Sequence, residues 1–122
     1  MPMPGDGRTL AVVGHGFIGR RVARAALADG WKVRSMARDP FAGARHHGRD
    51  QGHEILVGDA RHGEELAALL EGADHVVFAA GTTKPAESNE FPVHEVAANL
   101  SPLLATLDGM RRASVPGLTL PT

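Results

Sequence analysis

Three glycines, Gly14, Gly16 and Gly19, stand in the segment VVGHGFIGRR, where an apolar run gives way to a basic one. Their G-x-G-x-x-G spacing is typical of a strand-to-helix turn whose first helical amides, here those of Phe17 and Ile18, point at a bound phosphate. Gly14 would allow the tight turn, Gly16 the close approach of a pyrophosphate, and Gly19 the packing of the helix on a sheet. The alternative is a glycine-rich turn without a ligand.

The segments on either side of this loop have the periods that such a turn needs. Residues 9–13 (TLAVV) form a short apolar run typical of a buried strand. After Phe17 the apolar residues recur with a helical period, and Gly30 stands where a glycine commonly ends a helix. Residues 31–37 (WKVRSMA) alternate in character and predict a second strand.

The rest of the chain continues to alternate between strands and helices. Further strands are predicted at residues 54–57 and 75–80, and a fifth at residues 118–120. A short helix is predicted around Leu66, Leu69 and Leu70, and residues 39–53 are interpreted as a weak, short helix inside a loop. One long amphipathic helix with a kink at Pro102 is predicted from apolar positions with a helical period: Val93, Val96, Ala97, Leu100, Leu104 and Leu107.

This alternation predicts an α/β fold, a Rossmann-like doubly wound parallel sheet of four to five strands with helices on both faces. The 122 residues suffice for one domain. We expect residues 1–8 to be a disordered tail and residues 9–122 to form an incomplete NAD(P)-binding Rossmann domain.

Composition excludes several classes of function. The 13 basic and 14 acidic residues are mixed along the chain and aromatic residues make up 4%, which argues against a nucleic-acid partner. The chain has no cysteine, so disulfides and thiolate chemistry are excluded. We see neither a secretory signal nor a long apolar span and expect a cytoplasmic protein without a membrane partner.

The end of the second predicted strand bears on the choice of cofactor. A site that prefers NAD usually has an acidic residue about 20 positions after the glycines. Here Ala37 stands 18 positions after Gly19, and Arg38 follows it. An arginine suits a 2′-phosphate, which favours NADP over NAD. Arg38 could also be a solvated side chain, and Asp39 could still act as the acid.

Four segments resemble the NAD(P)-dependent epimerase/dehydratase family, the extended short-chain dehydrogenases. They are GFIG at 16–19, GDA at 58–60, DHVVFAAG at 74–81 and ANLSPLLATLDGMRRASV at 98–115. The resemblance runs from Thr9 to about Leu120. It implies a nicotinamide dinucleotide as cofactor and, in a full-length form, a nucleotide sugar as substrate.

The resemblance also implies roles for individual residues. Asp59 and Ala60 would lie near the adenine. Asn99 would lie near the nicotinamide half, and the end of the fourth strand would line the cofactor through Ala79, Ala80 and Gly81.

Two departures from the family stand out. Val13 occupies the position of the family's first glycine, so the loop is one residue tighter. The family's enzymes also use a Tyr-x-x-x-Lys pair, and this chain contains no tyrosine and ends at Thr122. We therefore expect the cofactor-binding N-terminal part of such an enzyme, inactive by itself. The alternative is a stand-alone dinucleotide sensor without catalysis, and an exposed sheet edge could be covered in a homodimer.

The histidines raise the alternative of a metal site, which the sequence supports less well. His46, His47 and His53 lie in one polar segment with Asp50, but no pair stands on a helix face with a third ligand. We interpret that segment as a solvated loop and expect no metal site.

Overall fold

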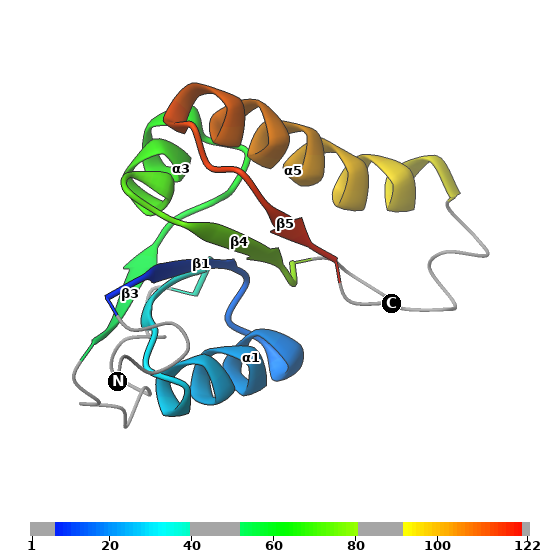
Figure 1. The fold of residues 1–122 in the computed structure, drawn as a ribbon. Coiled ribbons are helices and arrows are strands. Elements are labelled where there is room, and N and C mark those ends of the chain that lie inside the picture. The colour runs from blue at the N-terminus through cyan, green and yellow to red at the C-terminus, as the bar shows by residue number, and fades with distance from the viewer. Residues whose placement is uncertain (1–6, 40–51, 81–91, 121–122) are drawn as a thin grey trace.

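A computed structural model describes residues 7–39, 52–80 and 92–120, and within the last range the side chains from Leu100 onward. Five parallel strands form one sheet in the order β3-β2-β1-β4-β5 (Figure 1). Their bounds are Thr9–Val13 for β1, Lys32–Ala37 for β2, His53–Val57 for β3, His75–Phe78 for β4 and Leu118–Thr119 for β5. The expected doubly wound parallel sheet is confirmed.

Helices cover both faces of this sheet (Figure 1). Alternate side chains of β1 point to opposite faces, as the pleat of a strand requires. Leu10 and Val12 pack with Ala23 of α1 (Phe17–Ala28). Ala11 and Val13 pack on the other face, against α3 (Gly63–Leu70) and α5 (Pro92–Ala113).

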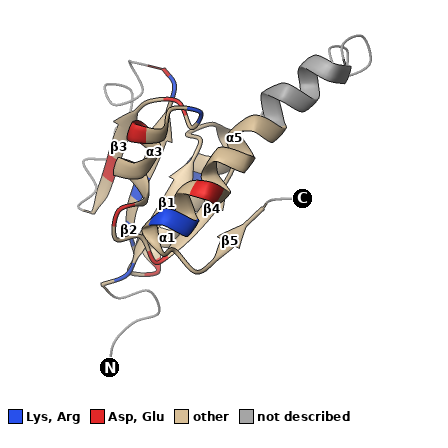
Figure 2. Ribbon diagram, turned by 90° about the horizontal axis from the view of Figure 1, so that it is seen from above, with Lys and Arg blue, Asp and Glu red and all other residues tan. Residues whose placement is uncertain are grey.

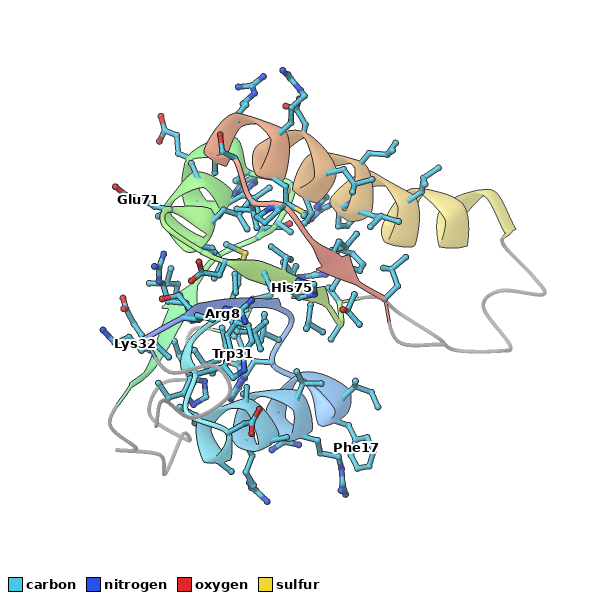
Figure 3. The ribbon with its side chains drawn as sticks, viewed as in Figure 1. Arg8, Phe17, Trp31, Lys32, Glu71 and His75 are labelled. Atoms are coloured by element: carbon cyan, nitrogen blue, oxygen red, sulfur yellow. The ribbon has the colours of Figure 1, made fainter. Side chains whose placement is uncertain are left out.

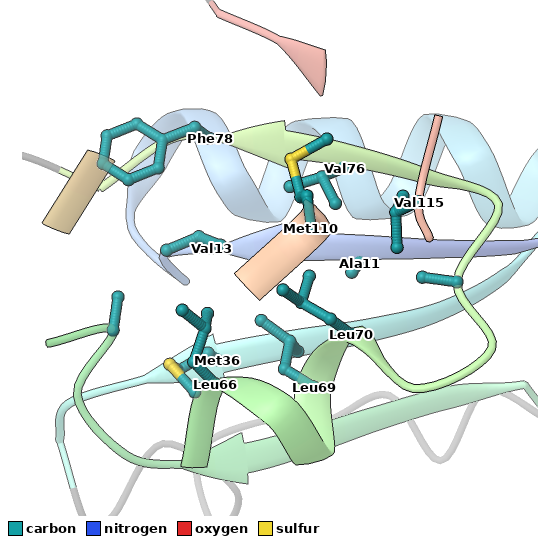
Figure 4. Close-up of a cluster of buried hydrophobic side chains, with 12 residues drawn as sticks. Ala11, Val13, Met36, Leu66, Leu69, Leu70, Val76, Phe78, Met110 and Val115 are labelled. Carbon is teal, nitrogen blue, oxygen red and sulfur yellow. The ribbon is translucent and has the colours of Figure 1, made fainter. Parts of the chain in front are cut away.

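The larger cluster of buried side chains lies between the sheet and the pair α3 and α5 (Figure 4). Leu66, Leu69 and Leu70 of α3 are at most 2% exposed. Arg34 of β2 also reaches α3, because its Nη1 donates to the carbonyl oxygens of Ala68 at 3.0 Å and Leu69 at 2.9 Å. These two bonds satisfy carbonyls at the carboxyl end of a helix, where intrahelical partners are missing.

Several predicted boundaries shift by a residue or two. The second strand begins at Lys32 and the third at His53, while β4 ends at Phe78. Gly30 has a φ of +91°, a left-handed conformation that favours glycine, so the predicted end of the first helix is confirmed. Most of the helix interpretation for residues 39–53 lies outside the described residues.

The apolar pattern of the long helix indicated the wrong buried face. Leu100, Leu104 and Leu107 are exposed, whereas Thr106 and Met110 are buried. The helix has two apolar stripes, and the one spaced 103, 106, 110 and 113 faces the core. The helix continues through Pro102, whose carbonyl oxygen accepts a hydrogen bond from Thr106 Oγ1 at 2.8 Å.

Basic and acidic residues are not gathered in one segment of the described part of the chain. Figure 2 shows basic and acidic segments scattered over the ribbon. Within the same residues, no helix is both long and apolar enough to cross a membrane.

Candidate functional site

The glycine loop directly follows β1, the central strand. The order of strands reverses at this strand, because β2 lies on one side of it and β4 on the other. The Gly14 amide donates to the Met36 carbonyl at the end of β2, at 3.0 Å. The Ala79 amide, just after β4, donates to the Val13 carbonyl at 2.8 Å. A crevice outside the carboxyl ends of parallel strands at such a switch point is where ligands of this fold class bind.

Gly14 must be glycine for reasons within the chain. Its φ of +109° is a conformation that other residues rarely adopt. A Cβ at this position would lie 2.8 Å from the Ala80 amide nitrogen and 2.9 Å from the Ala79 carbonyl carbon. The loop and the end of β4 are therefore in direct backbone contact.

Gly19 is constrained by packing as well. It is buried, and a Cβ there would overlap the carbonyl oxygen of Gly14 and lie 3.5 Å from Val12 Cγ1. The first turn of α1 thus packs directly on the loop that precedes it.

The substitution Gly19→Ala is expected to destabilise the fold by about 1–3 kcal/mol, because α1 must move away from the loop to admit the methyl group. Urea unfolding followed by circular dichroism measures this cost. The matched control is Gly63→Ala at the start of α3, where no described atom lies within 4 Å of an added Cβ. Equal costs for the two variants would contradict the close packing of α1 on the loop.

Gly16 differs from the other two glycines. Its φ of −92° is accessible to any residue, and no described atom lies within 4 Å of a Cβ added there. Neither backbone strain nor packing among the described residues explains a glycine at this position. A ligand that approaches the backbone closely from outside would explain it.

The amino end of α1 is electrostatically suited to an anion. The first turn of this helix has no acidic residue, and Arg20 and Arg21 lie beside it. In contrast, the first turn of α3 carries Glu64 and Glu65. Because a helix has a partial positive charge at its amino end, α1 presents that charge uncompensated next to Gly16.

Two apolar side chains project from the same turn. Phe17 is 62% exposed and Ile18 is 43% exposed, and Figure 3 shows Phe17 pointing away from the sheet. The Arg21 guanidinium lies 4.2 Å from the centre of the Phe17 ring. Both side chains are therefore directed mostly to solvent rather than into the core.

A second group of polar residues follows the neighbouring strands β2 and β3. Arg38 is exposed directly after β2, and Asp59 follows β3 by two residues. Asp59 accepts hydrogen bonds from the Arg61 guanidinium, at 2.6 Å from Nη2 to Oδ2 and 3.0 Å from Nε to Oδ1. These bonds, helped by the charge of Arg38, hold the pKa of Asp59 well below its usual range.

The loop after β3 is held by a further carboxylate. Glu65 Oε2 accepts the Asp59 amide at 2.8 Å and lies 3.1 Å from His62 Nδ1. The hydrogen bond from the Asp59 amide is the largest cause that lowers the pKa of Glu65. Asp59 is thus fixed through both its backbone and its side chain.

Sequence reasoning missed Arg61 and Glu65. The spacing Asp-x-Arg directly after a strand was the available signal, because an aspartate in a turn commonly accepts the amide two residues on. Here the Arg61 amide donates to Asp59 Oδ1 at 2.9 Å.

The remaining residues of the predicted site differ in burial, and some lie outside the described residues. The Ala60 side chain is buried in the core, so only its backbone can face a ligand. Ala79 and Ala80 are half-buried beside Gly14. Gly81 lies outside the described residues, and Asn99 lies in α5, with a side chain outside the described part.

The histidines of the polar segment are described only in part. His46, His47 and Asp50 lie outside the described residues. His53 Nε2 lies 3.0 Å from the buried Ser35 Oγ, and its ring centre is 5.9 Å from that of His15. Among the described residues, no three histidine or carboxylate side chains are grouped so that they could hold a metal ion.

A family model described as NAD(P)H-binding matches residues 14–120, from the first glycine of the loop to just after β5. The chain belongs to the NAD(P)H-binding family. The expected NAD(P)-binding domain is confirmed, and the expected likeness to NAD(P)-dependent epimerases and dehydratases is confirmed for the fold. The cofactor of this NAD(P)H-binding domain is a nicotinamide dinucleotide.

Solved structures share this fold at low sequence identity. UDP-glucose 4-epimerase from Bifidobacterium longum, in complex with NAD+ and UDP, is 23% identical with a TM-score of 0.81, over 93% of this chain. Pen from Bacillus thuringiensis is 18% identical with a TM-score of 0.85, over 97% of this chain. UDP-glucose 4-epimerase from Brucella ovis, in complex with NAD, is 20% identical with a TM-score of 0.78, over 93%.

This NAD(P)H-binding chain spans little more than a third of the length of those proteins: 36%, 38% and 35% respectively. Among curated proteins, no sequence matches it.

Proposed function

We propose that this chain binds NADP, and NAD less tightly, with the pyrophosphate against the loop from Gly14 to Gly19. The observation that carries the proposal is Gly16, because neither strain nor packing in the described chain explains a glycine there. The uncompensated amino end of α1 attracts the phosphate charges, and the amides of Phe17 and Ile18 donate to them.

The strand order supports a position for each half of the dinucleotide. The adenosine half extends from the loop across β2 to β3, where Arg38 meets the 2′-phosphate and Asp59 accepts the 6-amino group of adenine. The nicotinamide half extends toward β4, past Ala79 and Ala80. The family resemblance adds Gly81 and Asn99 to that half. When bound, the nicotinamide ring supplies hydride transfer.

We propose that these 122 residues bind the cofactor without turning over a nucleotide sugar. They contain no tyrosine, so they contain no Tyr-x-x-x-Lys pair to exchange a proton with a sugar hydroxyl. The UDP-glucose 4-epimerases with the same fold support a nucleotide sugar as the substrate class of a longer form.

Titration with NADPH and NADH, followed by nicotinamide fluorescence, tests the binding proposal. We expect saturable binding of both, with NADPH the tighter ligand. Circular dichroism of the same sample establishes that the chain is folded. A folded chain that binds neither dinucleotide would overturn the proposal, and turnover of a UDP-sugar would overturn its non-catalytic part.

Arg38→Gln is expected to weaken NADPH binding about 10- to 100-fold and to change NADH binding less than about two-fold. A hydrogen bond to a charged group contributes about 1.5–3 kcal/mol, and only NADPH has the 2′-phosphate that Arg38 would contact. The matched control is Arg111→Gln, since Arg111 is also exposed but pairs with Asp108 on α5. An equal loss for both dinucleotides would contradict the assignment of Arg38.

A further inference from the structure

Asp59 is held more firmly than an exposed loop aspartate needs to be. Its side chain is 18% exposed, while that of Arg61 is 53% exposed. The Arg61 guanidinium donates hydrogen bonds to both carboxylate oxygens of Asp59, and the Arg61 backbone amide donates another to Oδ1. A planar guanidinium that meets a carboxylate through two parallel bonds fixes its orientation as well as its charge.

The bonds to Arg61 occupy the two oxygens unequally. Oδ1 accepts the Arg61 amide at 2.9 Å and Nε at 3.0 Å. Oδ2 accepts Nη2 at 2.6 Å, and Nε lies farther from it, at 3.2 Å. Nε has a single hydrogen, which the two oxygens share, so three hydrogens of Arg61 reach the carboxylate. Because a carboxylate offers about four lone-pair sites, one site on Oδ2 remains for a donor from outside.

We propose that Arg61 is a positioning residue that fixes the free lone-pair site of Asp59 Oδ2, so that the site takes 6-amino purines and rejects 6-oxo purines. This inference rests on the proposed function, because it needs the adenine to lie beside Asp59.

The chemistry of the two purines gives the selectivity. The 6-amino group of adenine donates a hydrogen bond, whereas the 6-oxo group of hypoxanthine only accepts one. An ionised carboxylate only accepts, so a 6-oxo group would leave the remaining site on Oδ2 without a hydrogen. Hypoxanthine carries its donor on N1 instead, at a position that a carboxylate fixed opposite the 6-substituent does not meet. Asp59 is ionised at neutral pH, as an ordinary aspartate is, and the bonds to Arg61 lower its pKa further, so it has no proton to offer a 6-oxo group.

The test compares the affinity of NADPH with that of its hypoxanthine analogue, nicotinamide hypoxanthine dinucleotide phosphate in the reduced form. The natural chain is expected to bind NADPH at least about ten-fold more tightly. In Arg61→Met the ratio is expected to fall toward one, because the carboxylate can rotate. Arg61→Lys keeps the positive charge but loses the planar pair of donors. Its affinity ratio is therefore expected to lie between those of the natural chain and Arg61→Met.

Two further variants separate positioning from general stability. Asp59→Asn can present either an amide oxygen or an NH₂ group, so its ratio is expected to be close to one. Arg111→Met removes another exposed arginine that pairs with an aspartate and is expected to keep the natural ratio. If Arg61→Met does not fold, as judged by circular dichroism, the ratio of Arg61→Lys decides.

Two results would overturn the role of Arg61. One is that the natural chain binds NADPH and the hypoxanthine analogue about equally; the other is that both Arg61 variants keep the affinity ratio of the natural chain. Either result would leave the proposed function intact as long as both dinucleotides bind. Failure of the folded natural chain to bind NADPH, NADH or the analogue would instead overturn the proposed function.

Discussion

Gly16→Asp is expected to lower the affinity for NADPH at least 100-fold while leaving the fold as stable as before, or more so. An aspartate before a helix is among the best N-caps, because its carboxylate accepts amide hydrogens of the first turn. The same carboxylate would occupy the position proposed for the pyrophosphate and would repel it. The backbone at Gly16 is already extended, so the new side chain needs no change of conformation.

Binding and stability are measured separately for this variant. Fluorescence titration gives the affinity for NADPH, and thermal unfolding by circular dichroism gives the stability. Glu64→Gln is a suitable control, because it changes one charge in the first turn of a different helix, α3. Retained binding in Gly16→Asp would show that the phosphate does not lie at the amino end of α1.

The glycines show how far the sequence could lead. Their spacing was enough to predict a turn between β1 and α1, because only a few residue types tolerate such geometry. It could not separate their roles, since that depends on neighbours far along the chain. Gly14 is crowded by Ala79 and Ala80, which come more than sixty residues later. Only the fold shows that Gly16 faces open space among the described residues.

Arg61 was missed for a related reason. The resemblance to a family motif singles out Asp59 but says nothing of Arg61. The hydrogen bonds between them depend on a turn geometry that side-chain type alone does not specify. Residue types alone therefore indicate the turns of this region better than its side-chain network.

The long helix α5 shows where periodicity fails. Two apolar stripes run along it, and a helical period fits either of them. The choice is made by α3, whose leucines lie in one buried cluster with Leu103 and Met110 of α5. The sequence pattern contains no information about that neighbour. It therefore predicts burial of the stripe that the structure shows exposed.

Leu69→Ala is expected to cost about 2–5 kcal/mol of unfolding free energy, a large fraction of the roughly 5–15 kcal/mol that holds such a domain together. Leu69 is fully buried in the cluster between the sheet and the helices α3 and α5, so the substitution leaves a cavity. Its carbonyl bond to Arg34 belongs to the backbone and persists. Urea unfolding of this variant therefore reports the loss of packing alone.

The matched control is Leu104→Ala on the exposed stripe of α5, where the side chain is 55% exposed. This variant is expected to stay within about 0.5 kcal/mol of the natural chain, because it removes few contacts. A cost as large as that of Leu69→Ala would mean that this stripe is buried in solution. Dependence of the unfolding midpoint on protein concentration would then identify a second copy of the chain as its cover.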